Sequence, residues 1–350
     1  MLRIQLIGLL VMLTSVVFGQ INFNWVKQFG GPGVETITNI VTDSFNNVYM
    51  AGIFTGNIDI DPNIGVQQLV TTGQCDVYIV KLDSAGNLIW FKQFKSSAFV
   101  NTSNLEIDRN NNIYITGSFI DSVDFDPSIN NFILQTSLQS SFICKLDLNG
   151  EFIWVKDIPI LQIPSITIDV NSNIYLFGSF RDSVDIDPNA SIHMLYSNGK
   201  RDALILKMNS SGDFVWAHSY GSNEEDDALK GIVDKYGNIY FSGSFSDTVD
   251  FDQGVNVFNL YEGEGKMFII AIDSIGSFKW AKSYGVNLAP DSYITPSWMT
   301  SDSDCNIYLQ GYFKGSVDIN PNLDTNTISS MGDKDVYICK LDSLGNLIWV

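Results

Sequence analysis

The amino-acid sequence predicts an all-β protein, a β-propeller built from blades of four antiparallel strands. Three observations lead to this prediction. Six tryptophans recur at a spacing of about 64 residues, each interval contains the same order of strand and turn segments, and no window shows a sustained helical period. Because the period extends along nearly the whole chain, it outweighs local propensity.

The repeats define one propeller domain over residues 20–350, after a signal peptide at residues 1–19. Counted from tryptophan to tryptophan, the five repeats run approximately over residues 25–89, 90–153, 154–215, 216–279 and 280–349. A unit of this length is much longer than a β-solenoid repeat and shorter than a β-sandwich domain of ~100 residues. Both alternatives therefore fit less well than a propeller.

Each repeat contains two predicted hairpins. A short apolar stretch ends in aspartate, and after an Asn-rich turn comes a stretch such as VYMAGIF, whose alternation and aromatic content indicate a strand. A third strand, such as DVYIVKLD, leads through a D-x-x-G turn into the tryptophan strand. The turn aspartates are expected to bond turn amides, because a catalytic role for residues present in every blade would be unusual. In the first turn these are Asp43, Asp108, Asp169, Asp234 and Asp302.

One tryptophan strand, NWVKQFG at residues 24–30, precedes any complete repeat, and the last repeat stops at Trp349 and Val350. In one interpretation Trp25 belongs to a strand that completes the final blade and hides both edges of the ring. In the other, further blades follow in a larger propeller. We favour the second, because the pattern stops inside a strand that it requires. The Trp25 strand is expected to be the outer strand of a blade whose other strands come from elsewhere in the chain.

The first 19 residues are typical of a signal peptide. Arg3 gives a basic start, residues 4–17 are mostly apolar, and the segment ending at Gly19 offers a cleavage site before Gln20. A membrane anchor is the weaker alternative, because the apolar run is short for a span. We therefore expect export, to the cell surface or the surroundings, with no membrane insertion of the mature chain.

The composition argues against one large class of partners. The 350 residues include 39 acidic and 20 basic residues, which give a formal net charge of −19. A surface of that sign repels phosphate backbones, so nucleic-acid binding is not expected. With 45% hydrophobic residues, the chain can form a sizeable core.

The combination of NIYITGSF, DSVDFDP and the pattern K-L-D-x-x-G-x-x-I-W resembles the seven-bladed β-propeller (SBBP) repeat family. The resemblance covers about residues 23–350 and recurs five times, two fewer than the family's nominal seven. It implies a propeller in an exported protein, surface-bound or secreted, of Bacteroidetes-type bacteria. It implies little about a ligand.

An acidic phrase recurs in every repeat, as GNIDIDP, DSVDFDP, DSVDIDP, DTVDFDQ and GSVDINP. One interpretation is a Ca²⁺ site, because this ion prefers about six to eight oxygen ligands. The candidate ligands are Asp121, Asp124, Asp126, Asp182, Asp185, Asp187, Asp247, Asp250 and Asp252.

The alternative is a structural turn, in which Val123 and Phe125 fill the space between blades and Asp126 caps a turn that Pro127 stiffens. The apolar positions are kept in all five copies, whereas a carboxylate is lost in the first and last. This contrast favours the structural turn, and no other cofactor is expected.

The four cysteines do not form a disulfide or metal framework in the sequence pattern. Cys144 and Cys339 occupy one strand position that is aliphatic in the other repeats, so we expect buried, unpaired thiols. Cys75 and Cys305 lie in unrelated loops. The two histidines also lie at unrelated repeat positions, which argues against a histidine acid–base pair or a zinc site.

Two hypotheses for function follow. The first is a non-enzymatic binding or scaffold module that presents loops to a glycan, a protein or the cell envelope. The alternative is an enzyme of glycosidase, lyase or quinoprotein type with a site in the central channel. An enzyme should depart from the repeat in one blade, through acids, histidine or arginine that the other blades lack. The most deviant insert, GSNEEDDALKG at residues 221–231, is expected to be a solvated loop.

Overall fold

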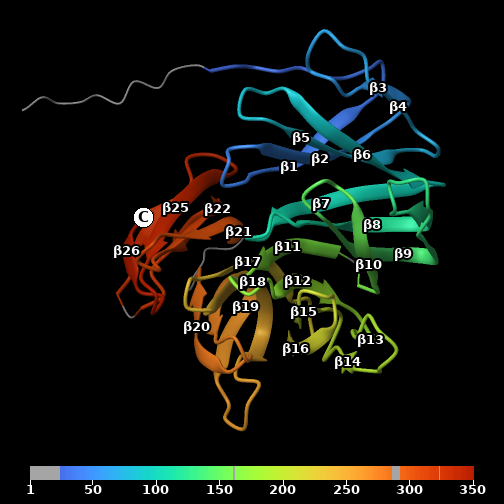
Figure 1. The fold of residues 1–350 in the computed structure, drawn as a ribbon. Helices are drawn as coiled ribbons and strands as arrows, with labels where there is room; N and C mark the ends of the chain where they lie inside the picture. The colour runs from blue at the N-terminus through green and yellow to red at the C-terminus, as the bar shows by residue number, and fades with distance from the viewer. Residues whose placement is uncertain (1–23, 161, 286–291, 323) are drawn as a thin grey trace, which may run out of the picture.

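The computed structural model describes residues 24–160, 162–285, 292–322 and 324–350. The signal peptide predicted at residues 1–19 lies outside the described residues. All regular elements in the described ranges are β-strands, which confirms the all-β prediction (Figure 1). No helix of the described chain has the length and apolar character needed to cross a membrane.

Twenty of the strands form five blades, each with four antiparallel strands in chain order. Blade 1 consists of β1 (Glu35–Thr42), β2 (Val48–Phe54), β5 (Asp76–Leu82) and β6 (Leu88–Ser96). Blade 2 consists of β7 (Phe99–Ile107), β8 (Ile113–Asp124), β9 (Ile133–Leu146) and β10 (Phe152–Ile158). Blade 3 consists of β11 (Gln162–Ile168), β12 (Ile174–Phe180), β15 (Asp202–Met208) and β16 (Phe214–Tyr220). Blade 4 consists of β17 (Asp227–Val233), β18 (Ile239–Asp250), β19 (Asn259–Ile272) and β20 (Phe278–Tyr284). Blade 5 consists of β21 (Tyr293–Ser301), β22 (Ile307–Lys314), β25 (Asp335–Leu341) and β26 (Leu347–Trp349).

The acidic phrase forms a small hairpin beyond the second and third strands of each blade. In blades 1, 3 and 5 this hairpin is separate. Its strands are β3 (Asn57–Asp59) with β4 (Gln68–Val70), β13 (Ser183–Asp185) with β14 (Met194–Tyr196), and β23 (Ser316–Asp318) with β24 (Thr327–Ser329). In blades 2 and 4 the long strands β8–β9 and β18–β19 continue into it past a register shift.

The blades meet around a centre formed by their first strands. Strand β7 contacts β1 and β11, and β17 contacts β11 and β21, so the five first strands follow one another around the middle (Figure 1). Five of the six periodic tryptophans, from Trp90 to Trp349, instead lie in the fourth, outer strand of a blade. Blades 3, 4 and 5 are separate sheets, whereas Lys95 and Ser96 of β6 pair with β8 and join blades 1 and 2 into one sheet.

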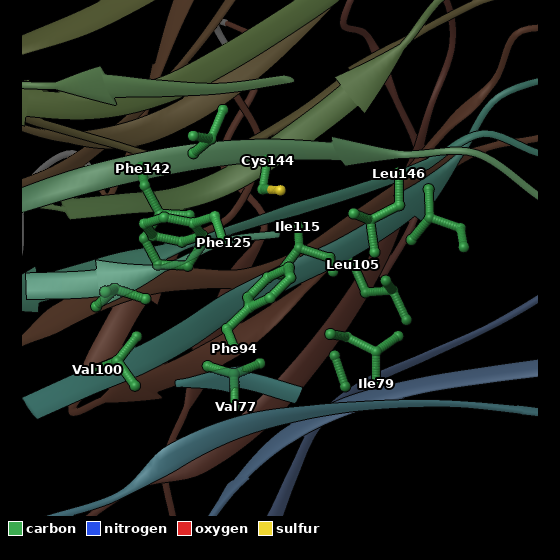
Figure 2. Packing of buried hydrophobic residues seen from close by; sticks show 14 of the residues in the cluster. Val77, Ile79, Phe94, Val100, Leu105, Ile115, Phe125, Phe142, Cys144 and Leu146 are labelled. Atoms are coloured by element: carbon green, nitrogen blue, oxygen red, sulfur yellow. The ribbon is translucent and has the colours of Figure 1, made fainter. Parts of the chain in front are cut away.

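The hydrophobic core lies between neighbouring blades. Val77 and Ile79 of blade 1 pack with Leu105, Ile115 and Phe142 of blade 2 (Figure 2). Both faces of the third strand β15 in blade 3 are buried, because this blade has a neighbouring blade on either side. Complete burial of one such side chain stabilises the fold by about 1.5–3 kcal/mol.

The tryptophan strand of one blade docks on the D-x-x-G turn of the next. Gly150 of blade 2 has a φ of +76°, and a Cβ atom there would lie 3.2 Å from Trp90 Cη2 and 2.7 Å from Lys92 Cε. Glycine accepts the left-handed backbone and leaves space for the indole. This contact explains why tryptophan and glycine recur together.

Trp25 makes the same contact with blade 1, where its Nε1 donates to the Ser84 carbonyl at 3.0 Å. However, residues 24–29 form no strand, and only Gly30 bridges to Asp59. The expected pairing of this segment as an outer strand is therefore wrong for the described residues. The fourth strand of blade 5 is β26, which comes from the same repeat as the other three. Among the described residues, the Trp25 segment belongs to none of the sheets.

All four cysteines are buried and unpaired. Cys144 and Cys339 are fully enclosed in the cores between blades, as the sequence predicts. Burial raises the pKa of the Cys339 thiol to about 12, so this thiol stays protonated at neutral pH.

Candidate functional site

The apolar residues of the acidic phrase fill the junction between blades. Val123 and Phe125 are fully buried in the core that blades 1 and 2 share. The Phe125 ring centre lies 4.7 Å from that of Phe142 in blade 2 and 5.3 Å from that of Phe94 in blade 1. Figure 2 shows these side chains together. The phrase therefore joins two blades through its apolar face.

The carboxylates of the phrase accept backbone amides. Asp124 Oδ1 accepts the amides of Asp126 at 3.2 Å and Phe132 at 2.9 Å, and Asp126 Oδ1 accepts the amide of Ser128 at 2.9 Å. Such bonds close Asx turns. Equivalent bonds are made by Asp185, Asp187, Asp250 and Asp252, and in the outer blades by Asp59, Asp61, Asp318 and Asn320.

The first position of the phrase has a left-handed backbone in every blade. The φ angle is +70° at Asp121, +56° at Asp182 and +57° at Asp247. In blades 1 and 5 the residue is Gly56, with φ of +72°, and Gly315, with φ of +74°. Aspartate and glycine are among the residues that tolerate this conformation. The left-handed backbone therefore explains why this position holds aspartate in three blades and glycine in two.

The structure does not gather the calcium candidates. Within the described ranges no three carboxylate, histidine or cysteine side chains converge in a way that could hold a metal ion. The nine candidate aspartates are spread over blades 2, 3 and 4, and two in each blade accept turn amides. Calcium binding at these positions stays a prediction, and chelation tests it.

The first hairpin turn of each blade is also closed by its aspartate. Asp108 Oδ1 accepts the amides of Asn110 and Asn112, both at 2.9 Å, and Oδ2 accepts Asn112 Nδ2 at 2.9 Å and the Tyr114 hydroxyl at 3.2 Å. Burial alone would raise the pKa of Asp108, but these bonds hold it below the ordinary value of 3.8. All five turns share the arrangement, so these acids have structural partners.

A cavity of about 260 Å³ lies among the first strands of the five blades. Every first strand contributes the residue four positions before its turn aspartate. These residues are Asn39, Asn104, Ser165, Lys230 and Trp298. The backbone repeats here, whereas four different residue types occupy the five equivalent positions. This central cavity is therefore the candidate functional site.

The cavity contains two charged side chains, Glu106 of β7 and Lys230 of β17. Burial raises the pKa of Glu106 to about 7, and within the described residues its carboxylate has no hydrogen-bond or ion-pair partner. Burial lowers the pKa of Lys230, whose Nζ donates to the Pro164 carbonyl at 3.0 Å. Burial therefore shifts both groups toward their uncharged forms.

Sequence reasoning missed this set, although one signal was present. Of the seven tryptophans, Trp298 is the one that does not follow the spacing of about 64 residues. Glu106 and Lys230 likewise occupy positions that are uncharged in the other blades. These departures are scattered over three repeats, so the search for one deviant repeat did not find them.

The acidic insert of residues 221–231 is not a simple solvated loop, which corrects the expectation. Asp226 is buried and accepts the amides of Ser222 at 2.7 Å and Ser246 at 2.8 Å. Arg201 Nη2 lies 3.1 Å from Glu225 Oε2 and 2.7 Å from Asp227 Oδ2. The insert thus connects blades 3 and 4, and its acids have structural partners.

Comparison with known proteins agrees with the repeat architecture. A family model described as a beta-propeller repeat, SBBP, matches residues 24–52. An uncharacterized WD repeat-containing protein of Acanthamoeba polyphaga mimivirus is 26% identical over 232 residues. The match covers 57% of this chain and 16% of that protein, so the chain spans a small part of this relative's length.

Two solved structures are similar over most of this chain, both extracellular domains of hybrid two component systems from B. thetaiotaomicron. The first is 13% identical, with 89% of this chain and 51% of that chain covered and a TM-score of 0.18. The second is 9% identical, with coverage of 91% and 59% and a TM-score of 0.17. The strand topology is that of a β-propeller, and within it residues 24–52 are similar to the beta-propeller repeat that the family model describes.

Proposed function

We propose that this chain is an exported, non-enzymatic binding or scaffold module whose ligand is a glycan, a protein or another envelope component. The observation that carries the proposal is the central cavity, where equivalent positions of five repeated strands present four different types of side chain. Packing and turn geometry explain why the other positions repeat. Neither requires a tryptophan, a lysine or an unpaired glutamate at the centre, so these residues are available for a ligand.

Binding fits the cavity better than hydrolysis. Glycosidases use two carboxylates that lie about 5–10 Å apart, whereas Glu106 is the one carboxylate among the described lining residues. One observation favours the alternative of a central-channel enzyme, namely the pKa of about 7 that suits Glu106 to general acid–base chemistry. The proposal requires no cofactor, and the acidic net charge disfavours nucleic acid.

Export is supported by the sequence of residues 1–19. Expression of the full chain in a bacterial host that processes signal peptides, followed by mass spectrometry of the recovered protein, tests it. We expect a mature chain that begins at Gln20 and is recovered outside the cytoplasm. An unprocessed chain in the cytoplasmic fraction would contradict this part of the proposal.

Binding and catalysis are separated by one experiment. The purified mature protein is incubated with peptidoglycan, envelope polysaccharide and envelope protein fractions, and each mixture is assayed for cosedimentation and for new products by mass spectrometry. We expect cosedimentation with at least one fraction and unchanged ligand. Release of sugars or unsaturated fragments would favour the hypothesis of a central-channel enzyme. A protein that binds none of the fractions would refute the proposed binding function.

A further inference from the structure

We propose that the central cavity binds one pyranose ring, with Trp298 as its stacking surface and Glu106, Lys230, Asn39 and Asn104 as its hydroxyl partners. The inference rests on the proposed binding function and assigns its site and ligand class. The ring could be a free sugar or a terminal unit of an envelope polysaccharide, and both present the same chemistry.

The size of the cavity restricts the ligand. A volume of about 260 Å³ is below the range of about 300–1,000 Å³ that holds drug-sized ligands, so a single ring fits better than an extended oligomer. Trp298 lines this space and remains 54% exposed, whereas buried tyrosines fill the blade cores. Its indole thus offers an apolar surface to the C–H face of a sugar ring, together with an N–H donor.

Hydrogen-bond donors with spare capacity line the cavity. Lys230 Nζ has three protons and one bond, to the Pro164 carbonyl at 3.0 Å. Asn39 Oδ1 accepts the Ile40 amide at 2.7 Å, which leaves its NH₂ group without a partner among the described residues. The Ser165 hydroxyl accepts the Gly231 amide at 3.2 Å and can still donate.

Acceptors stand beside these donors. Asn104 Nδ2 donates to the Ile163 carbonyl at 3.2 Å, so its Oδ1 is available. Both carboxyl oxygens of Glu106 lack a partner within the described part of the chain. A sugar hydroxyl both donates and accepts, and it is therefore the group that uses such a mixed set most completely.

The charge of the site argues for a hydroxyl-rich ligand over a strongly ionic one. One lysine and one glutamate line the cavity, so their formal charges are opposite and the site has no strong net charge. A polyanion would also meet the formal net charge of −19. A peptide side chain could enter the cavity, but it would use fewer of the polar groups than a ring with several hydroxyls.

The test is calorimetric titration of the full mature chain with methyl β-D-glucopyranoside, N-acetyl-D-glucosamine and D-glucuronate. We expect saturable binding of at least one, with a Kd on the order of 1 mM for so small a ligand. Trp298→Ala should weaken that binding about tenfold or more, and Glu106→Gln and Asn39→Ala should weaken it severalfold. Trp349→Ala is the matched control, because Trp349 is exposed on blade 5 and does not line the cavity.

The outcomes separate this inference from the function on which it rests. Binding that Trp298→Ala leaves unchanged, in a variant with the melting temperature of the wild type, would overturn the cavity as the sugar site. If no saccharide binds but the protein still cosediments with an envelope fraction, the sugar site is overturned and the proposed binding function stands. Loss of polysaccharide cosedimentation in Trp298→Ala alone would identify the bound ring as part of a glycan.

Discussion

Blades 1 and 5 have almost the same third strand, DVYIVKL in β5 and DVYICKL in β25, yet the two strands differ in burial. Val77 and Ile79 are 0% exposed, whereas their counterparts Val336 and Ile338 are 72% and 52% exposed. Blade 2 packs against this face of β5, and no described strand packs against the same face of β25. Burial in this architecture is therefore decided by the neighbouring blade and not by the strand itself.

The opposite side of blade 1 shows the same rule. Ile40 of β1 is largely exposed, while Leu105, at the same position of β7, is fully buried against blade 1. Residues 24–29 cover part of this side through Phe29, whose ring contacts Tyr78. A blade that has one neighbour therefore gains only part of the burial energy of a blade that has two.

The largest expected effect is at the junction of blades 1 and 2. Phe125→Ala should lower the free energy of unfolding by about 3–5 kcal/mol, because Phe125 is buried among Phe94, Phe119 and Phe142. Urea unfolding of the mature chain measures this loss. Ile129→Ala, at a fully exposed position two residues after Pro127, is the control and should have little effect. A loss below ~1 kcal/mol for Phe125→Ala would contradict the packing of the phrase between blades.

The same substitution in the two equivalent strands tests the comparison directly. Ile79→Ala should cost about 2–5 kcal/mol, and Ile338→Ala about 0.5 kcal/mol or less, because only Ile79 lies between two blades. Paired melting curves of the two variants provide the measurement. Equal costs would mean that another surface covers β25 in solution.

The comparison extends to the first strands through Glu106, since the same position of β1 holds Val41. Burial raises the pKa of Glu106 to about 7 from an ordinary value of 4.5. As the pH rises from 4.5 to 7, the unfolded chain ionises first, so this group lowers the stability of the fold. The loss should reach about 1–3 kcal/mol above pH 7, since one pKa unit corresponds to ~1.4 kcal/mol and water in the cavity reduces the effect.

Glu106→Gln should remove that pH dependence. The variant should match the wild type below the ordinary pKa and exceed it in stability above pH 7 by the amount just given. The difference between the two pH–stability profiles isolates this group from the other acids. Parallel profiles would show that Glu106 is well solvated.

Much of the fold follows from the sequence, because the period, the alternation and the turn residues all act locally. The positions of Cys144 and Cys339 could be read from the repeat for the same reason. The unpaired Trp25 segment and the exposed Ile338 could not be predicted, because both features depend on which strands pack next to them in the folded chain. The cavity was missed since Glu106, Lys230 and Trp298 come together only when the first strands converge.

The smallest expected effect returns to the first position of the acidic phrase, where the sequence alone suggests that Asp121→Ala should cost little, because glycine occurs there in blades 1 and 5. The φ angle of +70° changes that expectation. Asp121→Gly should be close to neutral, whereas Asp121→Ala should cost about 1 kcal/mol, because Ala resists a left-handed backbone. Melting temperatures of both variants, with and without a chelator, provide the test. If the phrase is a turn, the chelator changes neither the wild type nor the variants, and the order glycine above alanine holds. A calcium loop predicts the reverse: chelation lowers the melting temperature of the wild type, and both substitutions remove that response because both remove the carboxylate.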